Sequence, residues 1–118
     1  MKKILLVDDS TAIRNILKTA LVGEYQIIEA ENGRQAVDRA VSEKVDLFLL
    51  DVNMPVMDGI AAVREIRKLT QYGTTPIVML TTEVRETKKQ EGRDAGANGW
   101  VIKPCEPDKL LDVIHKLI

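Results

Sequence analysis

The sequence predicts an α/β fold with one five-stranded parallel sheet and helices on both of its faces. Three observations support this prediction. Short apolar runs typical of buried strands alternate five times with segments whose apolar residues recur at helical spacing. The segments are joined by short connections, many of them marked by Gly, Pro, Asn or Asp. The 118 residues suffice for one hydrophobic core but hardly for two. Right-handed crossovers then give a doubly wound (βα)5 sheet.

The five predicted strands differ in how apolar they are. Three are mostly continuous apolar runs, as expected for strands buried on both faces, at residues 4–7, 45–50 and 77–80, and residues 99–103 are a short fifth strand. The second strand, at residues 25–30, is interrupted by Gln26 and Glu29 and therefore predicts an edge strand. The sequence thus predicts three buried strands and places the second strand at an edge of the sheet.

The five predicted helices follow the strands. Asp9 or Ser10 can cap the first helix, Asp58 precedes the third, and Pro107 fits the first turn of the last. The residues expected to face the core are Ile13, Ile16, Leu17, Ala20, Leu21, Ala36, Val37, Ala40, Val41, Ala62, Val63, Ile66, Leu69, Leu110, Leu111, Ile114, Leu117 and Ile118. In the fourth helix, within residues 83–95, only Val84 and Ala95 are obvious anchors, so this helix should be the most loosely held.

Composition argues against several classes of function. Seventeen basic and eighteen acidic residues give a formal net charge of −1, which favours neither nucleic acid nor an anionic membrane as a partner. The apolar runs are too short to span a bilayer, and Asp8 follows the first one too soon for a signal peptide, so we expect a cytoplasmic protein. The single cysteine, Cys105, excludes an internal disulfide. No repeat or linker divides the chain, so one domain should cover residues 1–118.

Polar residues follow four of the predicted strands. Asp8 and Asp9 follow the first, Asp51 the third, Thr81 the fourth and Lys103 the fifth. Because the carboxyl ends of parallel strands share one edge of the sheet, these side chains should meet there. Neighbouring strands lie about 4.8 Å apart, so the carboxylates could bind one cation, and Mg²⁺ suits such oxygen ligands best. Without a cation among them, three carboxylates this close would repel one another.

The same residues suit a phosphoryl group. A metal ion and the Lys103 ammonium would neutralise phosphoryl oxygens, the Thr81 hydroxyl would orient the group, and a carboxylate would attack it. Each residue also has a simpler interpretation: an aspartate as helix cap, Thr81 as turn residue, Lys103 as partner in a surface ion pair. Their coincidence at four strand ends favours the phosphoryl site.

Over its whole length the chain resembles a receiver domain of bacterial two-component signalling. Four motifs carry the resemblance: Val7-Asp8-Asp9-Ser10, Leu50-Asp51-Val52-Asn53-Met54-Pro55 with Asp58-Gly59, Leu80-Thr81-Thr82 and Val101-Ile102-Lys103-Pro104. Residues 52–57, 88–92 and 99–100 are more particularly similar to single-domain chemotaxis regulators of the CheY type. The resemblance implies a flavodoxin-like sheet with strand order 2-1-3-4-5.

The resemblance also implies a role for each acidic residue. Asp51 matches the phospho-acceptor, which takes a phosphoryl group from a phosphohistidine on a CheA-like histidine kinase. Asp51 and Asp9 would bind Mg²⁺ directly, Asp8 largely through water, and Asn53 through its backbone carbonyl. No reaction on an external substrate is implied, only phosphoryl transfer to the domain and its own dephosphorylation.

Further residues match positions that read out or tune phosphorylation. Lys103 and Thr81 would contact phosphoryl oxygens, and the Lys103–Pro104 bond is expected to be cis, although only about 5% of X–Pro bonds are cis in general. Trp100 matches a switch aromatic that is exposed or mobile at rest and swings inward as Thr81 moves; alternatively it is a core side chain at an irregular edge. Asn53 and Glu83 match positions that set the rate of self-dephosphorylation.

The resemblance leaves the output open. The outer face of the fourth helix, with the fifth strand and the last helix, would bind partners, and a flagellar motor switch protein and a phosphatase are candidates for a monomeric regulator. A phosphorelay intermediate, a phosphate sink or an unphosphorylated binding module would fit the same residues. Two other classes fit less well. Aspartyl phosphatases carry a second aspartate where this chain has Asn53, and Asp8 and Asp9 would repel a flavin phosphate.

Overall fold

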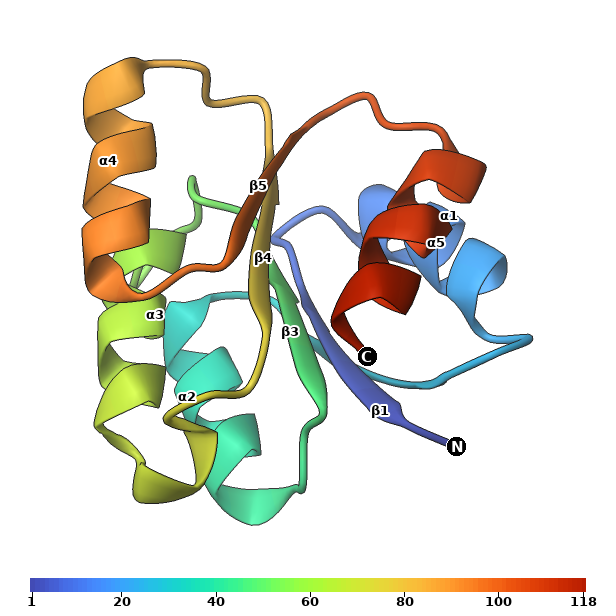
Figure 1. The fold of residues 1–118 in the computed structure, drawn as a ribbon, viewed down its shortest axis with the longest axis horizontal. Helices are drawn as coiled ribbons and strands as arrows, with labels where there is room; N and C mark the ends of the chain where they lie inside the picture. The colour runs from blue at the N-terminus through green and yellow to red at the C-terminus, as the bar shows by residue number, and fades with distance from the viewer.

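The computed structural model describes residues 1–118 and confirms a single parallel sheet (Figure 1). Its strands are β1 (Lys3–Val7), β2 (Gln26–Ala30), β3 (Leu47–Leu50), β4 (Ile77–Thr81) and β5 (Gly99–Ile102). They pair in parallel in the order β2-β1-β3-β4-β5, which is the predicted order. β2 lies at an edge, as its polar interruptions predict.

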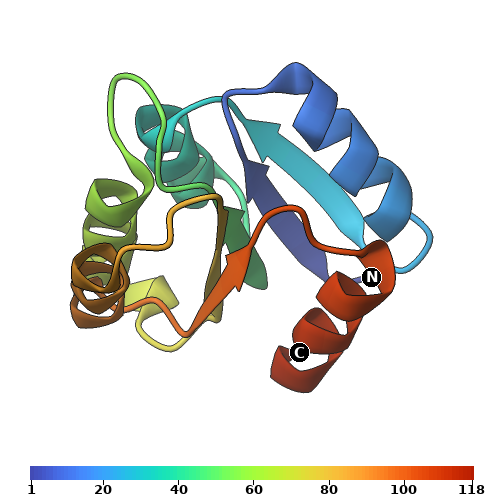
Figure 2. The same cartoon turned by 90° about the horizontal axis from the view of Figure 1, so that it is seen from above.

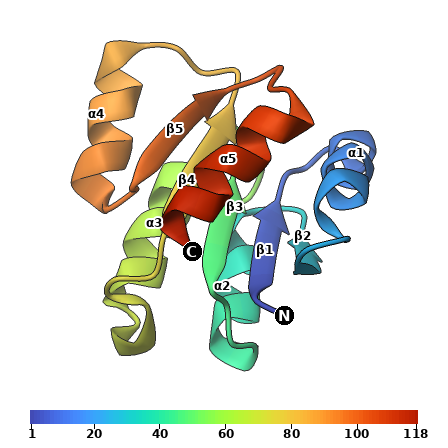
Figure 3. The same ribbon diagram turned by 45° about the vertical axis from the view of Figure 1, so that its right-hand side comes forward.

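The helices cover both faces of the sheet (Figures 2 and 3). They are α1 (Thr11–Leu21), α2 (Gly33–Ser42), α3 (Gly59–Lys68), α4 (Glu86–Ala95) and α5 (Pro107–Leu117), with a 3₁₀ turn at Thr70–Tyr72 after α3. α1 and α5 pack on one face, and α2, α3 and α4 lie on the other. No helix is both long and apolar enough to span a membrane.

The central strands supply two cores because successive side chains of a strand point to opposite faces. Leu49 and Val78 belong to the core beneath α1 and α5, whereas Leu50 and Met79 belong to the core beneath α2 and α3. These strands are fully buried, which explains their continuous apolar sequence.

Side chains fix where most helices begin. The Ser10 hydroxyl accepts from the Ile13 N–H at 3.2 Å, and the Asp58 carboxylate accepts from the Ala61 N–H at 2.8 Å. α4 has no such cap, and Gly92 is its one buried residue. Its weak anchoring agrees with the apolar-poor sequence.

For four residues, the prediction that they face the core or anchor a helix to it is wrong. Ile16, Val41, Val84 and Leu117 are exposed. Ile16 lines an apolar groove of about 300 Å³ beside Pro104 instead of packing under α1. Val84 lies in the loop before α4, because that helix begins only at Glu86. In the last turns of these helices Ala40 and Ile114 are fully buried and occupy the positions that face the core, whereas Val41 and Leu117 lie at the margin of the apolar stripe.

Candidate functional site

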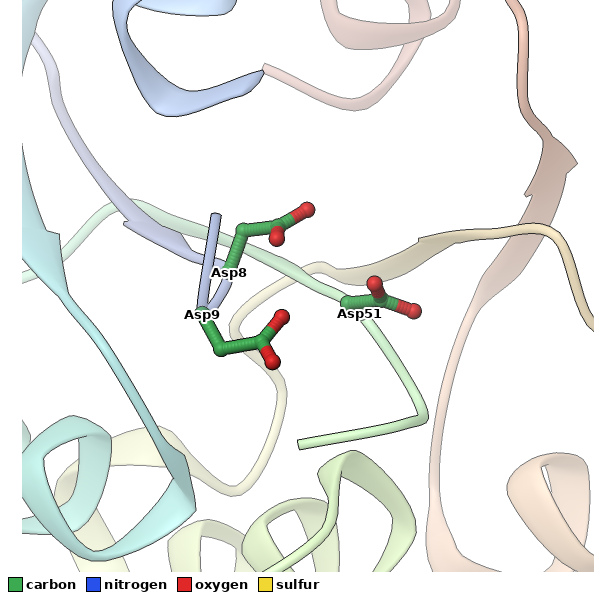
Figure 4. Close-up of side chains that lie close together, drawn as sticks. All are labelled: Asp8, Asp9 and Asp51. Atoms are coloured by element: carbon green, nitrogen blue, oxygen red, sulfur yellow. The ribbon is translucent and has the colours of Figure 1, made fainter. Parts of the chain in front are cut away.

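Three aspartates meet at the carboxyl edge of the sheet, as the sequence predicts (Figure 4). β1 and β3 are neighbours, and the Asp51 N–H donates to the Val7 carbonyl at 3.0 Å, so the residues that follow both strands are adjacent. One ligand atom from each of Asp8, Asp9 and Asp51 lies within 4.8 Å of the others. A single small cation could therefore contact all three carboxylates.

Lys103 reaches this cluster from β5, across the end of β4. Its Nζ donates to Asp8 Oδ2 at 2.8 Å and to Asp51 Oδ2 at 3.0 Å. Burial lowers the pKa of Lys103, but the hydrogen bonds to Asp8 and Asp51 outweigh burial and raise the pKa above its ordinary value. The Lys103–Pro104 peptide bond is cis, as the resemblance implies. The lysine thus brings a permanent positive charge to two of the carboxylates.

The three carboxylates differ in what holds them. Asp51 Oδ1 accepts from the Val52 N–H at 2.7 Å, and Asp8 Oδ1 accepts from the Ser10 N–H at 2.9 Å. The Asp9 carboxylate has no hydrogen-bond or ion-pair partner and is exposed. Because Mg²⁺ prefers carboxylate oxygens and water, this donor set fits Mg²⁺, with Asp9 as the least restrained ligand.

Thr81 and Glu83 follow the neighbouring part of the sheet edge, but neither side chain forms a hydrogen bond with the three aspartates. Thr81 is the last residue of β4 and fully buried, and its Oγ1 accepts from the Glu83 N–H at 3.2 Å. Hydrogen bonds from Arg85 lower the pKa of Glu83 to about 2. The Glu83 carboxylate is therefore a permanent anion, held by Arg85 (Nη2 at 2.6 Å).

Trp100 is half-buried in β5. Its Nε1 donates to the Glu83 carbonyl at 3.0 Å, and its ring packs against Gly92 of α4. A Cβ at position 92 would lie only 2.7 Å from the ring, so glycine makes room for the indole. The side chain is thus neither a solvent-exposed ring nor a fully enclosed core residue.

Sequence reasoning missed two residues near the site, Gly92 and Arg14. In the sequence, Gly92 only indicates a weak helix. Its contact with the Trp100 ring could not be predicted, because that ring belongs to another element. Arg14 is buried, and its guanidinium donates to the Asp8 carbonyl. Its spacing from Leu17 and Leu21 places it on the apolar face of α1, and that position was the available signal.

The fold and the site define an α/β domain with an acidic, lysine-bridged cluster at the carboxyl edge of its sheet. The chain belongs to the response regulator receiver domain family of two-component systems, whose model matches residues 4–115. The structure is similar to chemotaxis protein CheY4 of Vibrio cholerae, with a TM-score of 0.95 and 43% identity over 100% of this chain and 99% of that chain.

Other relatives are a transcriptional regulator and a sensor histidine kinase. The transcriptional regulatory protein ResD of Bacillus subtilis is 41% identical over 98% of this chain and 48% of ResD, so the chain spans about half the length of the curated relatives it matches. The receiver domain of sensor histidine kinase PA1611 from Pseudomonas aeruginosa is 29% identical, with a TM-score of 0.91 over 98% of this chain and 96% of that chain. That structure has a magnesium ion coordinated in its active site cleft.

Asp9→Asn should stabilise the metal-free domain by about 0.5–1 kcal/mol, because it removes an unpartnered charge that faces two other carboxylates. It should also abolish the stabilisation that we expect Mg²⁺ to give the native chain by mass action. Urea unfolding with and without Mg²⁺ measures both effects. Asp38→Asn, at an exposed position of α2, is the matched control and should change neither. Equal stabilisation of Asp9→Asn and native chain by Mg²⁺ would contradict this prediction.

Proposed function

We propose that this receiver domain is a phosphorylation-activated switch whose acceptor is Asp51. The contact between the Asp51 carboxylate and the Lys103 ammonium, beside two further carboxylates, is the main support. An Asp51 oxygen attacks the phosphorus of a phosphohistidine on a histidine kinase. The P–N bond breaks, the leaving nitrogen keeps the electron pair and is protonated, and an aspartyl phosphate forms.

The neighbouring residues serve this transfer. Asp8, Asp9, Asp51 and the Asn53 carbonyl would hold Mg²⁺, which supplies positive charge toward the phosphoryl oxygens. Lys103, already hydrogen-bonded to Asp51, would redirect a hydrogen bond to the phosphoryl group. In the separate hydrolysis that resets the switch, water attacks the phosphorus, the bond from the phosphorus to the Asp51 oxygen breaks, inorganic phosphate leaves, and the carboxylate is restored. Asn53 and Glu83 would set the rate of this hydrolysis.

The backbone of Glu83 supports a link between phosphorylation and a partner surface. Its N–H donates to the Thr81 hydroxyl, while its carbonyl accepts from the Trp100 indole. A shift of the Thr81 hydroxyl toward a phosphoryl oxygen would free the Glu83 N–H and disturb the residue that holds Trp100. The face formed by α4, β5 and α5 would change as a result.

Trp100 is the only tryptophan and reports on this change directly. Addition of acetyl phosphate with Mg²⁺ should alter its fluorescence in the native chain. The alteration should be absent without Mg²⁺ and absent in Asp51→Asn. An identical fluorescence change in Asp51→Asn would overturn the proposed switch.

For the pathway, we propose chemotaxis, with a CheA-like kinase, a motor switch protein as target and a phosphatase as a further partner. The match to CheY4 over nearly the whole of both chains supports it. We expect a cytoplasmic monomer. The identity with ResD favours a second candidate, the receiver half of a transcriptional regulator, and a relay or phosphate sink fits the same residues.

Binding of a purified flagellar motor switch protein tests the chemotaxis proposal. Affinity should rise on phosphorylation, and Asp51→Asn should not respond to the phosphoryl donor. If the phosphorylated domain does not bind, the chemotaxis assignment is wrong, whereas a fluorescence change of Trp100 in the same sample would leave the phosphorylation switch standing.

A further inference from the structure

Arg14 is a buried cation that the proposed phosphoryl chemistry does not use. Only 6% of the residue is exposed, although arginine is seldom buried without partners. Its guanidinium donates to three acceptors on three elements: the Asp8 carbonyl after β1, Glu29 Oε1 of β2 at 3.2 Å, and Thr11 Oγ1 of α1 at 3.3 Å.

The contact with the Asp8 carbonyl bears on the acidic cluster. That carbonyl belongs to the peptide group that joins Asp8 to Asp9. Because a peptide group is planar, a hydrogen bond that fixes its oxygen also fixes the direction in which the Asp9 backbone leaves it. Arg14 therefore acts on Asp9 without touching the Asp9 side chain.

Asp9 is the carboxylate that depends most on such a restraint. Asp8 and Asp51 are each held by Lys103 and by backbone N–H groups. The Asp9 side chain has no hydrogen-bond partner, so the part of its orientation that is fixed is the direction of the Cα–Cβ bond, which its backbone sets. The planar guanidinium can fix the Asp8 carbonyl, because two of its nitrogens donate at the same time to that carbonyl and to the Glu29 carboxylate. A lysine has only one nitrogen.

We propose that Arg14 is a positioning residue for the cation site, holding the Asp8–Asp9 peptide so that the Asp9 carboxylate points toward the other two. This inference rests on the proposed Mg²⁺ site. It differs from a purely structural role, in which the ion pair between Arg14 and Glu29 would only join α1 to β2.

Mg²⁺ titration of the full chain, followed by amide shifts in ¹H–¹⁵N spectra, tests the proposal. Arg14→Lys should raise the Kd for Mg²⁺ about tenfold, the lower range for residues that orient metal ligands. Glu29→Gln is the matched control, since it removes the ion pairs of Glu29 with Arg14 and Lys18 but leaves the bond from Arg14 to the Asp8 carbonyl and the longer Arg14–Glu31 pair (3.9 Å). Its Kd should stay within about twofold of the native value, even where urea unfolding shows that it is destabilised.

Asp9→Asn separates the failure of this inference from the failure of the proposed site. If Asp9→Asn binds Mg²⁺ with the native Kd, both the proposed cation site and the inference about Arg14 are wrong. If Asp9→Asn loses Mg²⁺ while Arg14→Lys keeps the native Kd, the inference alone is overturned.

Arg14→Gln provides a second variant, and spectral dispersion shows whether each variant is folded. A raised Kd in a folded variant, with the Glu29→Gln control unchanged, supports the positioning role. Loss of the native fold in both variants would assign Arg14 to the structure alone and overturn the proposal.

Discussion

Gly59→Ala is expected to lower the free energy of unfolding by about 3 kcal/mol, at the upper end for overpacking, because the added methyl group meets backbone. A Cβ at this position would overlap the backbone oxygen of Asp51 and lie 2.8 Å from its carbonyl carbon. The Gly59 N–H also donates to the Val52 carbonyl at 2.8 Å. The first turn of α3 therefore packs directly against the backbone that carries the acceptor.

Urea unfolding measures this loss, and Gly73→Ala is the matched control. Gly73 follows the 3₁₀ turn after α3, and the atom nearest to an added Cβ lies 3.8 Å away; its φ is −59°. We expect its stability to stay the same or rise by up to about 1 kcal/mol, since alanine restricts the unfolded chain. Equal losses in both variants would show that the contact between Gly59 and Asp51 is unimportant.

Lys103→Met is expected to slow phosphorylation by acetyl phosphate about 10²-fold or more, the typical effect of removing one preorganised donor from a reacting oxygen. The same change should tighten Mg²⁺ binding, because the ammonium competes with Mg²⁺ for the Asp8 and Asp51 oxygens. Opposite changes in rate and in metal affinity separate this effect from general damage to the site.

The rate of the Trp100 fluorescence change and an Mg²⁺ titration give the two quantities. Lys109→Met is the control, because Lys109 is exposed on α5 and has no ion-pair partner. It should alter neither. A native phosphorylation rate in Lys103→Met would contradict the role proposed for this lysine.

Much of the site was predictable because a parallel sheet brings the carboxyl ends of its strands to one edge. The apolar run at Leu47–Leu50 indicated a strand buried on both faces, and Asp51 had to follow it. The same reasoning predicted that Asp8, Thr81 and Lys103 would lie at that edge. The strand boundaries and the polar residues just beyond them were sufficient to predict which side chains lie at this edge.

What the sequence did not reveal depends on contacts between elements. Helical spacing gives the apolar stripe of α1, but not that the groove beside Pro104 leaves Ile16 exposed. Helical spacing places Arg14 on the apolar face of α1, but it does not reveal the acceptors at the ends of β1 and β2 that let the guanidinium be buried there. The contact between Gly92 and the Trp100 ring likewise could not be predicted without knowing how α4 packs against β5.

Intact mass after incubation with acetyl phosphate tests the central claim most directly. The native chain with Mg²⁺ should gain one labile phosphoryl group, and neither the native chain without Mg²⁺ nor Asp51→Asn with Mg²⁺ should gain it. The absence of an adduct on the native chain, under conditions where Mg²⁺ demonstrably binds, would contradict the account and favour a receiver-like module that is never phosphorylated. An adduct of equal yield on Asp51→Asn would show that Asp51 is not the acceptor.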